Sequence, residues 1–253
     1  MTNKLKYFVG NWKMFGDFSS FKIISKINLF GLKFRKKYKN LKIVICVPNT
    51  LIYFFTSKIK KSALSIGAQN CHHFSTSGPF TGSVNSAMLK NNGARYVILG
   101  HSDNRLDGDT NLIIKKKIEN SLDQKLDVIF CIGETLVEKK KKKTFLSLKK
   151  QIRESLNRKS NFKKIIIAYE PVWAIGTGKI PNITELEKIF KFIKKEFKKK
   201  LNTKKDPIVL YGGSVNSKNI RSFSPNSIID GFLIGGASQS SKNFIDIIKN
   251  YYK

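Results

Sequence analysis

The segment AYEPVWAIGTG, residues 168–178, joins a carboxylate to a strand end and to a glycine-containing loop. Glu170 closes the apolar run KKIIIAYE, and Pro171 stops that run. His101 ends a second apolar run, and Lys13 follows a third. These three side chains offer a base, a hydrogen-bond donor and a positive charge. Enolisation beside a carbonyl group needs this combination of groups.

Two glycine-rich turns add a candidate anion site. YGGSV (211–215) and GFLIGGAS (231–238) both carry a glycine pair directly after an apolar run. Backbone N–H groups exposed at such turns and at helix starts bind anions. With the base and the imidazole, the turns predict proton transfer on a small phosphorylated carbonyl compound.

The elements that must position these groups are eight short apolar runs. They cover residues 6–13, 41–48, 63–70, 94–101, 126–134, 163–171, 207–215 and 231–238. Several are continuous rather than alternating, which indicates a parallel sheet buried on both faces. Helix-like segments separate most of them, so the pattern predicts βαβ units. Eight units in 253 residues predict a closed (β/α)8 barrel, with residues 1–253 as a single domain. An open, doubly wound sheet is the alternative, because periodicity alone does not show closure.

The clearest predicted helix spans residues 183–201, with an apolar face at helical spacing. Thr184 and Glu187 are expected to form a capping box at its start. Residues 111–122 and 242–252 show similar helical patterns.

In a closed barrel the carboxyl ends of all strands meet on one face, where barrel enzymes carry their chemistry. The candidate groups are therefore expected to meet there.

The chain is strongly basic, with 48 Lys and Arg against 17 Asp and Glu, a formal charge of +31. One reading is a nucleic-acid partner. The favoured reading is compositional drift, because lysine far outnumbers arginine and the lysines are spread over the predicted helices. Nucleic-acid binding is then expected only as non-specific electrostatics. The run 139–143 is the exception, and it contains no aromatic residue.

Three cysteines, an odd number, are typical of reduced thiols and indicate a cytoplasmic protein. A signal peptide and a membrane span are not expected. GTGK (176–179) lacks the glycine and hydroxyl residues of a phosphate loop. Cys71, His72 and His73 are not expected to bind metal, because adjacent side chains of an extended chain point to opposite sides. Cys131 is expected to be a core thiol without a neighbouring base.

The motifs resemble the triosephosphate isomerase family from end to end. They are NWK (11–13), QN (69–70), GPFTG (78–82), GHS (100–102), CIGE (131–134), AYEPVWAIGTG (168–178), YGGSV (211–215) and GFLIGGAS (231–238). The resemblance implies interconversion of dihydroxyacetone phosphate and D-glyceraldehyde 3-phosphate through an enediolate. It places the enzyme in glycolysis and gluconeogenesis, without cofactor or metal.

The resemblance also implies the residue roles. Glu170 corresponds to the base and His101 to the neutral electrophile. Asn11 and Lys13 are expected to bind substrate oxygens and stabilise the enediolate. Backbone N–H groups are expected to hold the phosphate at Gly176, Ser214, Gly235 and Gly236. Asp103 is a supporting residue that is expected to reach less far toward Lys13, because it stands where the family has the longer glutamate.

The family forms homodimers in which a protruding segment of one subunit docks beside the other's active site. Here that segment corresponds to residues 71–87, with Thr81 at its tip. Ser83 and Asn104 replace a glutamate and an arginine that pair across the family's interface, so both charges are missing together. Gln239 replaces a leucine.

Two other functions stay open at this stage. One is a basic nucleic-acid-binding protein that kept the barrel and lost the chemistry. The other is a different phosphate-binding barrel enzyme, such as a synthase or epimerase. The retained site residues oppose the first, and the loop motif opposes the second.

Overall fold

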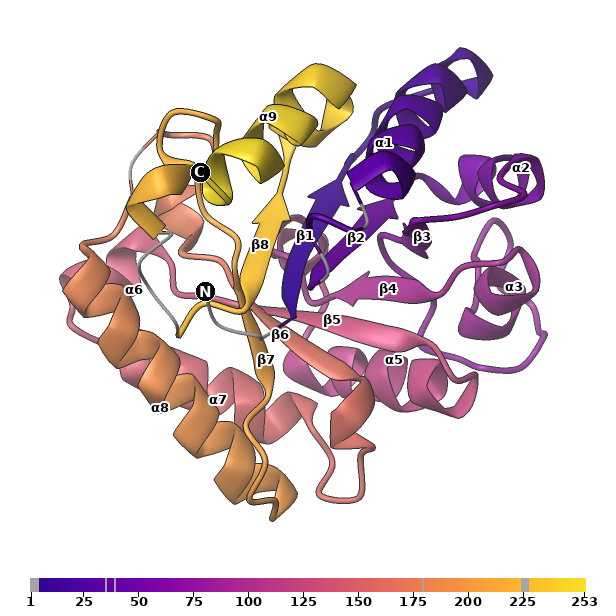
Figure 1. The fold of residues 1–253 in the computed structure, drawn as a ribbon. Coiled ribbons are helices and arrows are strands. Elements are labelled where there is room, and N and C mark those ends of the chain that lie inside the picture. The colour runs from indigo at the N-terminus through magenta and orange to yellow at the C-terminus, as the bar shows by residue number, and fades with distance from the viewer. Residues whose placement is uncertain (1–4, 35, 39, 179, 224–227) are drawn as a thin grey trace.

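The computed structural model describes residues 5–34, 36–38, 40–178, 180–223 and 228–253. Within these residues, eight parallel strands form a closed barrel in chain order (Figure 1). They are β1 (Lys6–Asn11), β2 (Leu41–Cys46), β3 (Leu64–Ala68), β4 (Tyr96–Leu99), β5 (Asp127–Ile132), β6 (Ile165–Tyr169), β7 (Ile208–Tyr211) and β8 (Gly231–Ile234). Closure comes from pairing of β1 with β8, where Tyr7 lies opposite Gly231. The closed-barrel prediction is confirmed, and the open-sheet alternative is wrong.

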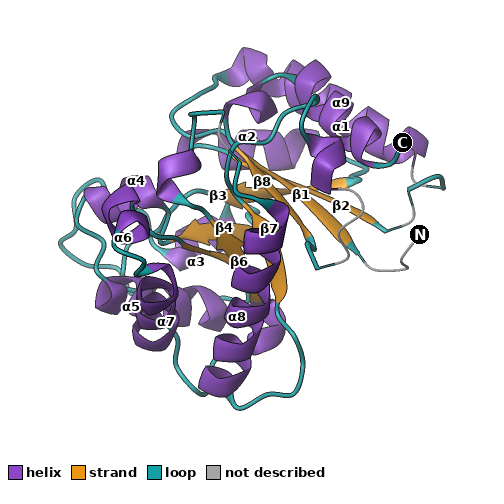
Figure 2. Cartoon of the chain, turned by 90° about the vertical axis from the view of Figure 1, so that its left-hand side faces the viewer, coloured by secondary structure: helices purple, strands orange, loops and turns teal. Residues whose placement is uncertain are grey.

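Helices cover the outside of the strands (Figure 2). In the described part of the chain they are α1 (Phe21–Phe34), α2 (Asn49–Lys58), α3 (Ser86–Asn91), α4 (Ser102–Leu106), α5 (Asn111–Asp123), α6 (Leu136–Lys140), α7 (Thr144–Ser155), α8 (Ile183–Leu201) and α9 (Ser241–Tyr251). Two short 3-10 turns, η3 (Val172–Ala174) and η5 (Gly236–Gln239), lie after β6 and β8. Each strand lies inside its predicted apolar run. Most of the polar and glycine residues that end these runs lie just beyond the strands, at the barrel mouth.

Helix α8 has the predicted bounds, but its predicted cap is wrong. Asn182 is the N-cap, and its side chain accepts the backbone N–H of Thr184 at 2.8 Å. Thr184 is already inside the helix, so its hydroxyl does not take the cap position. An asparagine one residue before the helix is an equally good cap. The predicted apolar face is buried against the barrel, through Leu186, Ile189, Phe190, Ile193, Phe197 and Leu201.

The core has two layers because strand side chains alternate between the barrel interior and the helices. The interior layer includes Val9, Ile98, Ile129, Ala168 and Leu233, all buried. The outer layer packs strand residues such as Phe8, Val97 and Phe130 under the helices. This packing fixes the carboxyl ends of the strands on a rigid support.

The three cysteines are free and buried. No group of three metal-ligating side chains occurs among the described residues. The His72 and His73 rings lie 4.5 Å apart, so the expectation that they point to opposite sides is wrong. Both rings pack on Phe74, and His72 also packs on Phe80. No helix of the described residues is long and apolar enough to cross a membrane.

Candidate active site

Glu170 is the first residue after β6, and its backbone continues the pairing of that strand. Its N–H donates to the Ile132 carbonyl at 2.8 Å. Two glycines make room for it. A Cβ at Gly133 would lie 1.8 Å from the Glu170 carbonyl oxygen, and one at Gly212 would lie 2.6 Å from Glu170 Cγ. The carboxylate is therefore held between β5 and β7.

The Glu170 side chain is almost completely buried, with a relative exposure of 4%. Burial raises the pKa of this carboxyl above its ordinary value. The neighbouring His101 imidazole, a hydrogen bond from the Cys131 thiol and the Lys13 charge offset part of that rise in the pKa. A base with a raised pKa binds a proton more readily than a solvated carboxylate.

Cys131 was expected to lack a neighbouring base, and this expectation is wrong. Its thiol is in the barrel core as predicted, yet it donates to the Glu170 carboxylate. Burial and the Glu170 charge both raise the pKa of the thiol, so it stays protonated. Cys131 pairs with Ala168 across β5 and β6, two residues before Glu170. The contact depends on strand register, which the sequence does not display.

His101 is the N-cap of α4 and is buried. Its Nδ1 accepts the backbone N–H of Asp103 at 3.1 Å. A neutral imidazole with an accepting Nδ1 carries its proton on Nε2. That Nε2 lies 3.4 Å from Glu170 Oε1. The imidazole donor and the carboxylate base therefore point into the same space.

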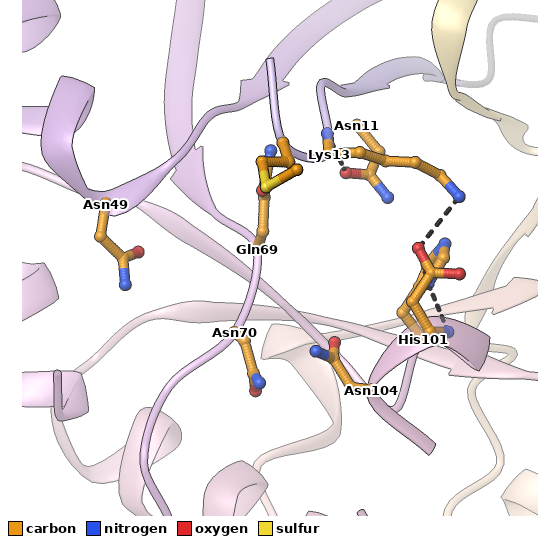
Figure 3. Close-up of a pocket in the computed structure, with 9 residues that line it drawn as sticks. Asn11, Lys13, Asn49, Gln69, Asn70, His101 and Asn104 are labelled. Atoms are coloured by element: carbon orange, nitrogen blue, oxygen red, sulfur yellow. Dashed lines mark hydrogen bonds and ion pairs between the residues drawn. The ribbon is translucent and has the colours of Figure 1, made fainter. Parts of the chain in front are cut away.

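Lys13 lies just beyond β1, with a left-handed backbone at a φ of 55°. Its N–H donates to Asn11 Oδ1 at 3.1 Å, and its Nζ lies 3.0 Å from Asp103 Oδ2 (Figure 3). The shorter Asp103 therefore still reaches the lysine. Both side chains of the ion pair are more than a third exposed, so its contribution to stability is small. Its effect is to aim the ammonium group toward His101.

Gln239, which replaces the family's leucine, supports the same segment from the other side. Its Nε2 donates to the Trp12 carbonyl at 2.8 Å. The Trp12 indole N–H donates to the Ser238 carbonyl at 3.0 Å. These bonds tie the strand end that carries Lys13 to the turn η5.

A cavity of about 240 Å³ brings the candidate residues together. Its lining includes Asn11, Lys13, His101, Glu170, Gly176, Ser214, Gly235 and Gly236. One end holds the side chains that can act on a carbonyl, and the other holds glycine-rich backbone. Drug-sized ligands occupy pockets of about 300–1,000 Å³, so this cavity suits a smaller molecule.

The segment after Glu170 forms a loop over the cavity. Gly176 lines the cavity and has a φ of 70°, and Gly178 has a φ of 75°. The loop is attached at its start, where the Trp173 indole donates to Glu134 Oε1 at 2.8 Å. Glu134 is buried and also accepts from the Tyr169 hydroxyl. Glu134 is the last residue of the CIGE motif, and its spacing in the sequence does not predict this anchoring contact. The last residue of the rejected GTGK motif lies outside the described residues.

A second hollow of about 260 Å³ adjoins the first and shares Asn11, Lys13 and His101 with it. Its outer wall is polar and includes Asn49, Gln69, Asn70 and Asn104 (Figure 3). Thr81 is exposed in a turn and lines neither of these cavities. All other predicted site residues line one of these cavities.

The fold and this mouth define a (β/α)8-barrel protein with a pocket for acid–base chemistry on a small anion. The family model described as triosephosphate isomerase matches residues 6–251, and the chain belongs to that family. It is 38% identical to the triosephosphate isomerase of Dictyoglomus thermophilum, over 97% of this chain and 99% of the relative. It is also 38% identical to that of Saccharomyces cerevisiae, over 96% of this chain and 98% of the relative.

A solved structure agrees with the sequence relatives. The crystal structure of triosephosphate isomerase from Bartonella henselae superposes with a TM-score of 0.88 at 32% identity, covering 98% of this chain and 99% of that one. The similarity therefore extends over the whole barrel and not only over the motifs.

Proposed function

We propose that the protein interconverts dihydroxyacetone phosphate and D-glyceraldehyde 3-phosphate, as an enzyme of glycolysis and gluconeogenesis that needs no cofactor or metal. The observation that carries the proposal is the 3.4 Å approach of His101 Nε2 and Glu170 Oε1 in a cavity lined by glycine-rich backbone. The family membership supports the same reaction. We infer that residues 1–253 form one domain.

The chemistry follows from the positions of the groups. Glu170 removes a proton from the carbon beside the carbonyl, and the C–H electron pair becomes the new C=C bond. The carbonyl electrons move to oxygen, where the His101 Nε2–H donates to the developing charge. Lys13 and the Asn11 amide stabilise the resulting enediolate. A proton then moves from the hydroxyl of the enediolate to its charged oxygen, beside His101 Nε2, and Glu170 returns its own proton to the neighbouring carbon. The C=C electron pair forms the new C–H bond and the deprotonated oxygen forms the new C=O bond, which exchanges the aldehyde and ketone positions.

The phosphate group is held mainly by backbone. Gly176, Ser214, Gly235 and Gly236 line one end of the cavity, and we infer that their backbone N–H groups bind the dianion. Closure of the loop over the bound substrate excludes water. Exclusion of water matters because an exposed enediolate phosphate eliminates its phosphate.

We also infer a homodimer through residues 71–87, in a cytoplasmic enzyme. In this arrangement Thr81 of one subunit enters the polar hollow beside Lys13 and His101 of its partner. Met14 supports the inference, because it lines that hollow and is fully exposed. Burial of this apolar side chain in a partner would explain its place on the surface.

A coupled assay with glyceraldehyde 3-phosphate tests the proposal. The parent protein should turn the substrate over, and Glu170→Gln should lower kcat by about 10²–10⁴-fold, the usual contribution of a positioned base. Glu170→Asp keeps the carboxylate at a shorter reach and should retain more activity than the amide. The proposal is wrong if the parent shows no turnover or if Glu170→Gln matches it.

A further inference from the structure

Helix α8 carries a lysine stripe on the face opposite its buried side. Lys188, Lys191, Lys195 and Lys199 are all exposed. At 3.6 residues per turn they fall within about 80° of arc, and they extend over about 16 Å of helix. Residues 188–205 contain nine lysines and one carboxylate, so this side of the molecule is far more basic than the chain average.

Three carboxylates near the stripe are engaged elsewhere, while Glu187, four residues before Lys191 on α8, forms no ion pair within the described residues. Glu196 pairs with Arg153 and Asp206 pairs with Lys198. Glu185, at the helix start, pairs with Lys139. None of the four stripe lysines forms an ion pair with another residue in the described part of the chain. Their ammonium groups are therefore available to an external anion.

A groove of about 460 Å³ runs along one edge of the stripe, lined by Lys191, Lys194, Lys195 and Lys198 with Asp206 and Ile228. Two of these lysines belong to the stripe, while Lys194 pairs with Asp230 and Lys198 pairs with Asp206. Its other wall is formed by Asp206 and Ile228, which precede β7 and β8. None of these residues lines the catalytic cavity.

We propose that the α8 stripe binds the phosphate backbone of single-stranded nucleic acid. A straight row of positive charges matches the row of phosphates along an extended strand. The groove offers no aromatic side chain for base stacking and no arginine for base reading, so binding should be independent of sequence. A membrane surface fits less well, because Ile228 is the only large apolar side chain in the groove.

Fluorescence anisotropy with a labelled RNA of mixed sequence, about 20 nucleotides long, tests the proposal over a salt titration. The test variant changes the four stripe lysines to glutamine. The matched control changes four other exposed lysines to glutamine: Lys22, Lys26 and Lys33 of α1 and Lys36 just after it. Both variants lose the same charge, and neither touches the catalytic cavity. Unchanged isomerase activity and melting temperature check that each is folded.

The parent should bind the RNA at low salt. The slope of log affinity against log salt should be shallower by roughly three in the stripe variant, since each phosphate contact in a single strand contributes about 0.7. Over a fourfold rise in salt, the four contacts account for about a 50-fold loss of affinity. The control should change the slope by much less.

Three results would overturn the proposal. An equal loss of RNA affinity in both variants would mean that binding depends on net charge and not on the stripe. No RNA binding by the parent at about 50 mM salt would remove the site altogether. Capture of phosphatidylserine vesicles without RNA binding would assign the surface to a membrane.

Discussion

His101 Nε2 and Glu170 Oε1 lie 3.4 Å apart at the ends of β4 and β6, with the Nδ1 of the same imidazole accepting a backbone N–H. The ring is thereby oriented as a donor toward the space that the base also faces. Neither strand pairs with the other, so the closed barrel alone brings the two side chains together. The arrangement leads to the following expectations.

The pH dependence of catalysis should report the raised pKa of Glu170. The base works only when ionised, so kcat/KM should fall on the acid side with an apparent pKa above the ordinary carboxyl value of 4.5. A pH series of kcat/KM, measured with buffers that do not bind phosphate sites, checks this. An acid limb at or below the ordinary value would contradict the buried environment.

The raised pKa of Glu170 should also make the stability of the folded protein depend on pH. Because the pKa of Glu170 is raised in the folded state, the folded protein holds this proton more tightly than the unfolded chain. Its contribution to stability is full below the unfolded value near 4.5 and is lost as the pH rises through the folded pKa. Glu170→Gln does not titrate, so it should be the more stable protein at neutral pH. Denaturant unfolding at several pH values should show the difference shrinking toward acid.

Cys131 should act on catalysis through Glu170. Cys131→Ala removes the hydrogen bond that favours the ionised carboxylate, so the acid limb of kcat/KM should move to higher pH. Cys131→Ser keeps a donor and should restore the parent profile in part. Loss of the buried sulfur should also cost on the order of 1 kcal/mol of stability. A stability loss with no movement of the pH profile would reduce Cys131 to a packing residue.

The loop should depend on the left-handed backbone of Gly176. Gly176→Val strains a φ of 70° without meeting any atom within 4 Å, so the fold should survive. Loop closure should suffer, with a higher KM and a lower kcat for the phosphorylated substrate. Gly108→Val is a matched control, because Gly108 has a φ of 104°, equally free space and no place in the catalytic cavity. Equal kinetics for both variants would mean that the loop has no part in binding.

The proposed dimer should loosen at low ionic strength. Each chain carries a formal charge of +31, and salt screens charges beyond a Debye length of about 8–10 Å. The missing charges at Ser83 and Asn104 remove an attraction that could offset the repulsion. Sedimentation should show more monomer in dilute buffer than in moderate salt. The same dimer fraction in both would count against this expectation.

Much of the site could be predicted from the sequence, because a closed parallel barrel places the carboxyl ends of all its strands on one face. Glu170, His101 and Lys13 each follow an apolar run, and closure of the eight strands places all three on one face. The sequence alone could not exclude an open sheet, because only the pairing of β1 with β8 shows that the barrel is closed.

Contacts set by register or by side-chain direction could not be predicted. The Cys131–Glu170 bond depends on how β5 and β6 align. The 4.5 Å approach of the His72 and His73 rings depends on the local course of the chain, which bends at His73. The α8 cap shifted to Asn182 because a cap is chosen by backbone geometry at the helix start, where several polar residues compete.

The most direct test of the account follows the proton. Dihydroxyacetone phosphate and the enzyme are incubated in deuterium oxide, and NMR records deuterium at the carbon that bears the exchanging proton. The parent should place deuterium there during isomerisation, because the proton held by Glu170 exchanges with solvent before it returns. Glu170→Gln, once its melting curve shows that it is folded, should lose deuterium exchange and isomerisation together. Undiminished exchange in that variant would contradict the assignment of Glu170 as the base.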